Sequence, residues 1–531
     1  MPAFPRLPLH LPPRALRVLW LLLPVLGAAL AYAPALGGGF TGDDWTILAL
    51  ARHGTSPWTY YVGDHTLAYS YRPHGMVTWW LAARAFGADP AGHHALALAL
   101  HAGNALLLLL LARRYGAALS TAAIAALLLA VHPAAIGTAV WLSDRYDLLA
   151  LGGALATLLA LHHAAQRGRG GIALLVAAAL LAAGSKETAF AVAGAGLVWI
   201  AVAAPPRRWL MAAALLAPFA LALLMRLLVF GGSGLGRLGE HAGSPLQHLG
   251  GVWLWLRHLP ALLAGEPAWI AALALAALVL LHGAGRGRAS AWTRERSAAL
   301  LAALALALLP GLLQAPITRL ALAGEAPLAS ITNARFYYLA LGGVLLVAAV
   351  LARQRAGVGS AKAPPVVVAR LRALLAGAIA LALAAAFAWQ SHALARYWRD
   401  DTAAPQRLAV NAGAVAATRA TAARGLPCRV GLLDAGGASP DFPRFADSLV
   451  KAQLPPGAAA LDCVVGGGQA SWLVLTAQAL PPGQAPVARS EGALHRPQAV
   501  LGMTAYYPDE PVRQASRAVW RWDGVRFREV R

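Results

Sequence analysis

Long apolar runs constrain the fold of this chain more than any other feature. Stretches such as 93–112, 209–230 and 298–314 are rich in Ala and Leu and carry almost no charge. A hydrocarbon core about 30 Å thick is crossed by about 20 helical residues. Only helices and closed barrels satisfy their backbone there, and these runs are continuous rather than alternating, so they predict α-helices. We therefore expect a polytopic α-helical membrane protein.

The 531-residue chain contains about eleven such predicted transmembrane helices. The first follows a short basic N-terminal segment and is expected to be a signal anchor rather than a cleaved signal peptide. Two of the runs, 118–131 and 171–183, are short for a straight crossing, so we expect them to be extended by loop residues or broken. The predicted spans lie near 15–34, 93–112, 118–131, 147–164, 171–183, 188–204, 209–230, 262–282, 298–314, 335–352 and 370–390.

The charge pattern supports this count and argues against nucleic-acid binding. The formal net charge is +22, but many of the basic residues sit in short turns between predicted spans. With residues 1–14 in the cytoplasm, every second turn is basic and nearly free of acid, as the positive-inside bias requires. The opposite loops carry the acids and aromatics. We therefore expect an integral protein of the cell (inner or plasma) membrane, with loop 35–92 and the C-terminal part outside the cytoplasm.

Residues 391–531 lose the long apolar runs and gain Pro, Gly, Asp and Arg. Three apolar segments bounded by turns read as buried strands, and "PRFADSLVKAQL" reads as a helix between two of them. "AVWRWDGVRF" has the alternation and the Asp-Gly pair of a β-hairpin. We expect a small extracytoplasmic α/β domain here, after a transmembrane domain spanning 15–390. Its two cysteines, Cys428 and Cys463, form either a disulfide or two buried thiols.

Polar residues of the first 400 positions gather in the loops predicted to be external. Carboxylates near a membrane are costly, so their presence there indicates a function. Several spans deliver acids, cations and aromatics to one level, as expected of a cavity at the outer membrane boundary. The candidate site residues are Asp43, Asp44, Tyr71, Arg72, Asp144, Arg145, Lys186, Glu187 and Arg335.

The residue types in these loops indicate a substrate with three parts. Burial and a like charge raise the pKa of a carboxyl group, so one acid of an adjacent pair can serve as a proton acceptor. Arginine and lysine bind phosphate in charge-assisted pairs. Aromatic residues such as Trp45, Trp58, Tyr60 and Tyr61 stack on a sugar ring or mark the membrane interface. A sugar, a phosphate and a long apolar tail would satisfy all three groups.

The order of these motifs resembles the GT-C superfamily of membrane glycosyltransferases. It runs "GF…DDW", "SYRPH", a His-Pro at a span end, "W…SDRYDLLA", "GSKET" and "NARFYYLA", over roughly residues 35–345. The pattern is most similar to the transmembrane O-mannosyltransferases whose soluble part carries tetratricopeptide repeats. It is less similar to the protein O-mannosyltransferases and the lipid A aminoarabinose transferases.

The resemblance implies roles for individual residues. Asp43 matches the catalytic base of the family's first external loop, and Asp44 would help to orient it. Tyr71 and Arg72 would lie beside the donor, Lys186 and Glu187 match the family's Lys-Glu pair, and Arg335 would face the lipid phosphate. Two features depart from the family: the C-terminal part has no 34-residue repeat, and "SDRYD" replaces a Gly-Arg-Ala-Asp-like motif. Mannose and a protein acceptor are therefore not carried over.

The implied reaction is inverting transfer of a sugar from a polyprenyl-phosphate donor to an external hydroxyl of a glycan, lipid or protein. No cofactor is expected for a monophosphate donor, whereas a lipid pyrophosphate would call for Mg²⁺ or Mn²⁺.

Simpler interpretations remain open at this stage. The acidic pair also suits the N-cap of a loop helix. Arg72 suits a snorkelling interface residue, and Lys186 with Glu187 suits a helix-start ion pair that joins two spans. A transporter or flippase would also gather polar groups between helices, and an inactive GT-C-like scaffold is a third possibility.

Overall fold

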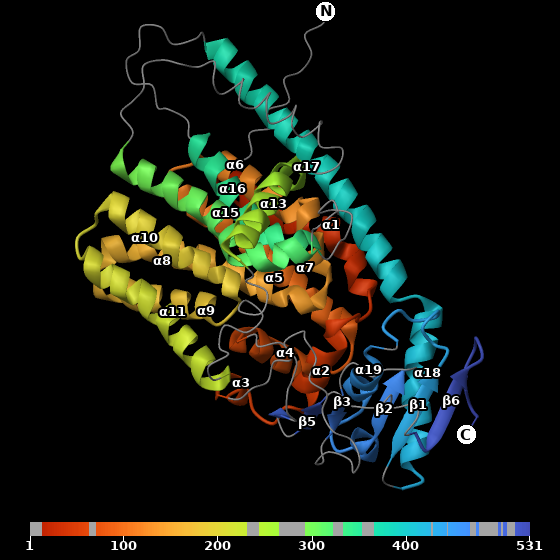
Figure 1. Cartoon of the computed structure of the whole chain (residues 1–531). Helices are drawn as coiled ribbons and strands as arrows, with labels where there is room; N and C mark the ends of the chain where they lie inside the picture. Colours follow the sequence, from red (N-terminus) through yellow and green to blue (C-terminus); the bar gives the residue numbers. More distant parts are fainter. Residues whose placement is uncertain are drawn as a thin grey trace, which may run out of the picture.

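The computed structural model describes residues 13–62, 71–230, 244–264, 293–321, 333–352, 366–425, 428–442, 444–467, 474–476, 498–500, 503–506 and 516–530. Helices make up most of the chain, and a small group of strands follows near the C-terminus (Figure 1).

Seven helical segments in the described part of the chain are long and apolar enough to cross a membrane, which confirms the predicted class of a polytopic helical membrane protein. The helices concerned are α1 (Pro13–Tyr32), α5 (Pro90–Arg114), α8 (Arg145–Arg167), α11 (Arg208–Phe230), α15 (Arg294–Ala321), α16 (Tyr338–Leu351) and α17 (Val366–Thr402).

The short run at 118–131 is a broken helix, one of the two outcomes expected for it. Helix α6 (Leu119–Val131) is followed by η2 (Pro133–Ala135) and α7 (Ile136–Val140), with a bend of 52° between the two halves. Pro133 has no backbone N–H to continue the ladder, which accounts for the break. Two further predicted spans form the shorter apolar helices α9 (Arg169–Ala183) and α10 (Ala191–Ala203). The predicted span 262–282 lies mostly outside the described residues.

Short helices connect the apolar ones and carry most of the predicted motifs. Three of them, α2 (Asp43–His53), α3 (Thr59–Val62) and α4 (Pro73–Phe86), lie at the end of the bundle that faces the C-terminal strands (Figure 1). The remaining elements between α1 and α17 are η1 (Ala33–Gly37), η3 (Leu142–Asp144), η4 (Glu187–Phe190), α13 (Pro245–Ala264) and η6 (Asn333–Tyr337).

The last long helix, α17, does not end where the composition changes. It continues past Trp389 to Thr402, and α18 (Pro405–Ala422) follows after a short break. The boundary predicted at 390/391 therefore falls inside α17, because the helix continues after the apolar run ends. Figure 1 shows α17 running along the bundle to the C-terminal strands.

The C-terminal residues form two small sheets, and each of the three turn-bounded apolar segments contributes one strand to them. One sheet has the order β2-β1-β6-β7, with β1 (Arg429–Leu433) parallel to both β2 (Val464–Gly467) and β6 (Ala518–Trp522). Strand β7 (Phe527–Glu529) pairs antiparallel with β6 across the predicted Asp-Gly turn. The other sheet is antiparallel, with the order β3-β5-β4; these strands are β3 (Val474–Thr476), β4 (Gln498–Val500) and β5 (Met503–Tyr506).

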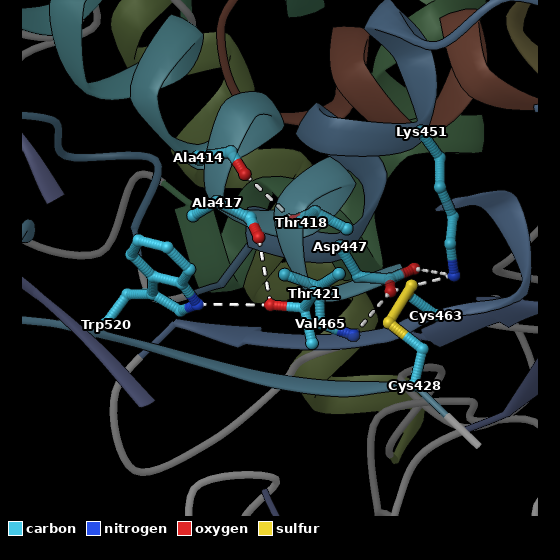
Figure 2. Close-up of a disulfide and its surroundings, with 10 residues drawn as sticks. All are labelled: Ala414, Ala417, Thr418, Thr421, Cys428, Asp447, Lys451, Cys463, Val465 and Trp520. Atoms are coloured by element: carbon cyan, nitrogen blue, oxygen red, sulfur yellow. Dashed lines mark hydrogen bonds and ion pairs between the residues drawn. A yellow bond between two sulfur atoms is a disulfide. The ribbon is translucent and has the colours of Figure 1, made fainter. Parts of the chain in front are cut away.

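A buried aspartate joins a helix of this domain to two of its strands, and a disulfide links the residues that precede β1 and β2 (Figure 2). Asp447 of α19 (Ala446–Gln453) accepts two hydrogen bonds from Lys451 Nζ, at 2.8 and 2.9 Å. It also accepts backbone N–H groups from Val465 in β2, at 3.1 Å, and Leu475 in β3, at 2.8 Å. Cys428 and Cys463, next to η7 (Ala459–Asp462), form a disulfide with their Cα atoms 4.6 Å apart, so the first of the two alternatives holds.

We predict that Asp447→Ala unfolds the C-terminal domain at a lower temperature than the wild type. The substitution leaves the fully buried Lys451 ammonium without its carboxylate and leaves two strand N–H groups unsatisfied. Removal of one partner from a buried ion pair costs about 3–5 kcal/mol. Thermal unfolding of the purified protein in detergent measures the change. Asp434→Asn, which alters an exposed pair with Arg521, is the control, and equal melting temperatures for both variants would contradict the prediction.

Candidate active site

The acidic pair lies in the first turn of α2, directly after a glycine with an unusual backbone. Gly42 is the N-cap residue and has φ 58° and ψ −126°, a backbone conformation that residues with a Cβ atom rarely adopt. Asp43 and Asp44 follow it, at the end of the helix where the macrodipole favours negative charge. The acidic pair therefore lies at the start of a helix, but at its first two helical positions rather than at the expected N-cap, which is Gly42. A catalytic role is compatible with this position.

The two carboxylates have different surroundings. Asp44 is only 1 % exposed; its Oδ1 accepts from Ser143 Oγ at 2.5 Å and its Oδ2 accepts from the Thr41 backbone N–H at 3.0 Å. Burial raises the pKa of Asp44 from 3.8 to about 8, against the lowering effect of these hydrogen bonds. Asp43, by contrast, is exposed. The pair is thus divided into one buried acid with a raised pKa and one carboxylate that a substrate can reach.

An aromatic ring joins this loop to Arg335 in η6. The Trp141 Nε1–H donates to the Thr41 carbonyl at 3.4 Å, and the same ring would lie 3.8 Å from a Cβ atom on Gly42. The Arg335 guanidinium lies over the Trp141 ring, 4.5 Å from its centroid, and its Nη1 is 3.6 Å from Asp144 Oδ1. One tryptophan therefore separates the acidic pair from a cation.

Three further cations, which lie before α4, before η4 and in α11, form ion pairs with acids of η4 and α8. Arg72, the residue before α4, donates from Nε and Nη2 to Glu187 Oε2 at 3.0 and 2.7 Å. Arg226 of α11 donates to the other oxygen, Glu187 Oε1, at 2.9 Å. Lys186 donates to Asp147 of α8. In place of the single helix-start ion pair considered for Lys186 and Glu187, Lys186 pairs with Asp147, and Glu187 pairs with Arg72 and Arg226.

These groups form one cluster, which we call the cation cluster: Arg72, Lys186, Arg226 and Arg335 with their partners Asp144, Asp147 and Glu187. Asp144 lies within electrostatic range of Arg335, Lys186 and Arg72. Its Oδ2 atom is buried and accepts no hydrogen bond from the described residues. Tyr146 lies beside the cluster, with the Arg72 guanidinium 5.3 Å from the centroid of its ring.

Two predicted residues lie apart from the cation cluster. Arg145 is fully buried, with its guanidinium 4.4 Å from the centroid of the Trp79 ring and its Nη2 3.5 Å from the His93 carbonyl oxygen. It therefore packs between α4 and α5. Tyr71 is 7 % exposed and donates its hydroxyl to the Tyr61 carbonyl at 3.0 Å. Asp64 and His65 of the loop before Tyr71 lie outside the described residues.

Arg226 is the member of the cluster that the sequence analysis did not select. It interrupts the apolar run 209–230, and a charged residue inside such a run is a signal for a functional or paired position. That signal was present, but the partner of Arg226 lies 39 positions away and no local pattern identifies it.

Metal binding stays an open prediction. Within the described ranges, no group of three or more His, Cys, Asp or Glu side chains is positioned to hold a metal ion. The acids of the cation cluster are instead engaged with arginine and lysine.

Two solved structures are similar to this chain. One is ArnT from Cupriavidus metallidurans bound to undecaprenyl phosphate, at 14% identity and a TM-score of 0.46, covering 93% of this chain and 98% of ArnT. Another is the oligosaccharyltransferase AglB from Archaeoglobus fulgidus with an inhibitory peptide and a dolichol-phosphate, at 14% identity and a TM-score of 0.42.

The alignment with AglB covers 82% of this chain but only 64% of AglB, so this chain spans under two thirds of that protein. No family model matches the sequence, and no curated protein matches it either. Likeness of this degree leaves the reaction, the donor and the acceptor to be argued from the residues of the site.

We predict that Asp44 makes the protein less stable as the pH rises. Because its folded pKa of about 8 lies above the ordinary value of 3.8, the folded state keeps a proton that the unfolded state releases. The free energy of unfolding therefore falls between about pH 4 and pH 8, by up to about 1.4 kcal/mol per pH unit.

Melting temperatures between pH 5.5 and 8 test this directly. Asp44→Asn, which cannot ionise, is expected to show a flatter pH dependence than the wild type. Asp89→Asn, at the exposed N-cap of α5, should keep the wild-type slope. Identical slopes for Asp44→Asn and the wild type would contradict the assigned ionisation.

Proposed function

We propose that this protein is a membrane glycosyltransferase that moves a sugar from a polyprenyl-phosphate donor to an acceptor hydroxyl outside the cytoplasm. The observation that carries the proposal is an exposed carboxylate, Asp43, at a helix start that Trp141 joins to Arg335 of the cation cluster. Such a transfer requires both a base and a phosphate site.

The cation cluster is the proposed site of the donor phosphate. Arg335 is the cation most available to it, because its contact with Asp144 is the longest of the cluster's ion pairs, at 3.6 Å, and its side chain is 24 % exposed. Guanidinium groups bind phosphate oxygens in charge-assisted pairs that are roughly twice as strong as neutral hydrogen bonds. Arg72, Lys186 and Arg226 would add positive charge around the same phosphate as it leaves.

Asp43 is the proposed general base. In this step the acceptor O–H proton moves to the Asp43 carboxylate, the acceptor oxygen bonds to the anomeric carbon, and the bond from that carbon to the phosphate oxygen breaks. The polyprenyl phosphate keeps the bonding electrons, and the anomeric centre inverts. Asp44 takes no proton from the acceptor in this scheme; it holds the helix start through Thr41 and Ser143.

The side of the membrane follows from the charge pattern rather than from the fold. Basic turns alternate with acidic loops along the sequence, and the positive-inside bias assigns the acidic pair and the C-terminal domain to the extracytoplasmic side. The donor would then meet its acceptor, whether a cell-envelope glycan, a lipid or a secreted protein, outside the cytoplasm.

We predict that Asp43→Asn lowers the turnover number by about 10²–10⁴, the usual contribution of a general base. Binding of polyprenyl phosphate should change little, because an amide of the same size replaces the carboxylate. Transfer from radiolabelled polyprenyl-phosphate hexoses in membrane vesicles measures the effect, and Asp89→Asn is the matched control. Undiminished transfer by Asp43→Asn would remove Asp43 from the reaction, and solute transport without transfer would favour a carrier.

We also predict that Arg335→Ala weakens the binding of undecaprenyl phosphate by about 10- to 100-fold. Loss of one charged hydrogen bond costs about 1.5–3 kcal/mol, and about 1.4 kcal/mol corresponds to a tenfold change in affinity. A titration of the purified protein with undecaprenyl phosphate gives the dissociation constants. Arg521→Ala, which removes an exposed arginine of the C-terminal domain, controls for net charge; an equal loss in both variants would contradict a specific site.

A further inference from the structure

The turn that carries the acidic pair is held by a residue almost 400 positions away. Asp441, in the segment between β1 and α19, is 4 % exposed. Its Oδ1 accepts from the Gly42 backbone N–H at 3.0 Å and from Thr41 Oγ1 at 3.2 Å. Its Oδ2 accepts from the Trp45 Nε1–H at 2.8 Å. One buried carboxylate thus binds residues on both sides of Asp43 and Asp44.

Arg407 of α18 fixes Asp441 in this position. The Arg407 Nη2 donates to Asp441 Oδ2 at 2.8 Å and to Thr41 Oγ1 at 2.5 Å. Its side chain is 3 % exposed, so the pair is removed from water on both sides. Arg407 also donates from Nη1 to the exposed Asp401 Oδ2 at 3.1 Å, so Asp441 is its buried partner. Loss of one partner from a buried charge pair is costly, and this holds the Asp441 carboxylate against Arg407.

The backbone before the turn is held by the same part of the chain. The Gly39 N–H donates to Thr402 Oγ1 at 2.9 Å. A Cβ atom on Gly39 would lie 2.5 Å from the Thr402 carbonyl oxygen, so only glycine allows this close approach. The loop 39–45 is therefore fixed between the end of α17, α18 and the segment before α19.

Ordinary domain docking explains the other contacts of α2 but not these. Further along the helix, Thr46 Oγ1 donates to Ser448 Oγ at 3.0 Å and Arg52 donates to the Ala452 carbonyl at 2.6 Å. These bonds use neutral acceptors and would suffice to hold α2 against α19. The Arg407–Asp441 pair, by contrast, binds the turn that carries Asp43 and Asp44.

We propose that Asp441, held by Arg407, is a positioning residue that sets the direction of the Asp43 carboxylate. This inference rests on the proposed function, because it assigns to the C-terminal domain a part in the transfer step. Asp441 makes no contact with substrate in this account; it acts through the Thr41, Gly42 and Trp45 groups that it binds.

The test compares Asp441→Ala and Asp441→Asn in the full-length protein. In Asp441→Ala, the Thr41 hydroxyl, the Gly42 N–H and the Trp45 Nε1–H lose the carboxylate that accepts their hydrogen bonds. If the turn then moves by about 1 Å, the rate falls on the order of 100-fold. We expect that loss in the turnover number, an unchanged KM for the donor, and faster hydrogen exchange at the amides of residues 41–45. Asp441→Asn keeps one oxygen that can accept from the Gly42 N–H, but it places an amide N–H beside the Arg407 guanidinium. Its loss of turnover should therefore be intermediate.

Glu529→Gln is the matched control, because it alters an exposed carboxylate of the same domain that is paired with Arg424. It should leave both turnover and exchange unchanged. Trp45→Phe, which removes one donor to Asp441 and keeps the charge pair, should lower turnover less than Asp441→Ala without lowering the melting temperature as much.

Two outcomes would overturn the proposal. One is wild-type turnover in Asp441→Ala while Asp43→Asn is inactive, which leaves the proposed function standing and removes the positioning role. The other is a loss of turnover matched by equal losses in donor binding and melting temperature, which is the signature of general unfolding. Full transfer by Asp43→Asn would instead defeat the proposed function itself, and exchange at residues 41–45 would still report whether Asp441 holds the turn.

Discussion

The pairing of charges at the edge of the apolar bundle is the constraint on which the rest of this structure depends. Isolated ions are costly near hydrocarbon, so each cation of the cluster lies against a carboxylate from another helix: Arg72 and Arg226 share Glu187, Lys186 binds Asp147, and Arg335 approaches Asp144. The same pairs tie α4, α8, α11 and η6 together. An anionic headgroup that binds the cluster would therefore compete with these acids for the cations. We expect it to bind Arg335 first, because the ion pair of Arg335 with Asp144 is the longest in the cluster.

The two carboxylates of the acidic pair differ in burial. Asp43 and Asp44 are neighbours in sequence, yet one is exposed and the other is enclosed by Ser143 and Thr41. Enclosure favours the protonated form of Asp44, so the turn carries less negative charge than its sequence suggests. The C-terminal domain contributes to this turn as well, through Asp441 and Arg407. The membrane bundle and the C-terminal domain thus contact each other at the turn where the reaction is proposed.

Local patterns predicted those parts of the structure that local physics determines. Apolar runs gave the long helices, the short run ending in His132-Pro133 gave the broken one, and Asp523-Gly524 gave the hairpin of β6 and β7. The sequence also identified the cations Arg72, Lys186 and Arg335, because charge is conspicuous in such a chain. It could not identify their partners, the burial of Arg145 or the hold of Asp441 on Gly42, since these contacts join residues 39 to 399 positions apart.

The most direct measurement is a cryo-electron microscopy structure of the full-length protein with undecaprenyl phosphate bound. The account predicts phosphate density within hydrogen-bonding distance of Arg335 and at least one of Arg72, Lys186 and Arg226, on the side of the cluster that faces Asp43. Phosphate density elsewhere on the bundle, or an Asp43 carboxylate turned away from the bound phosphate towards bulk water, would contradict it.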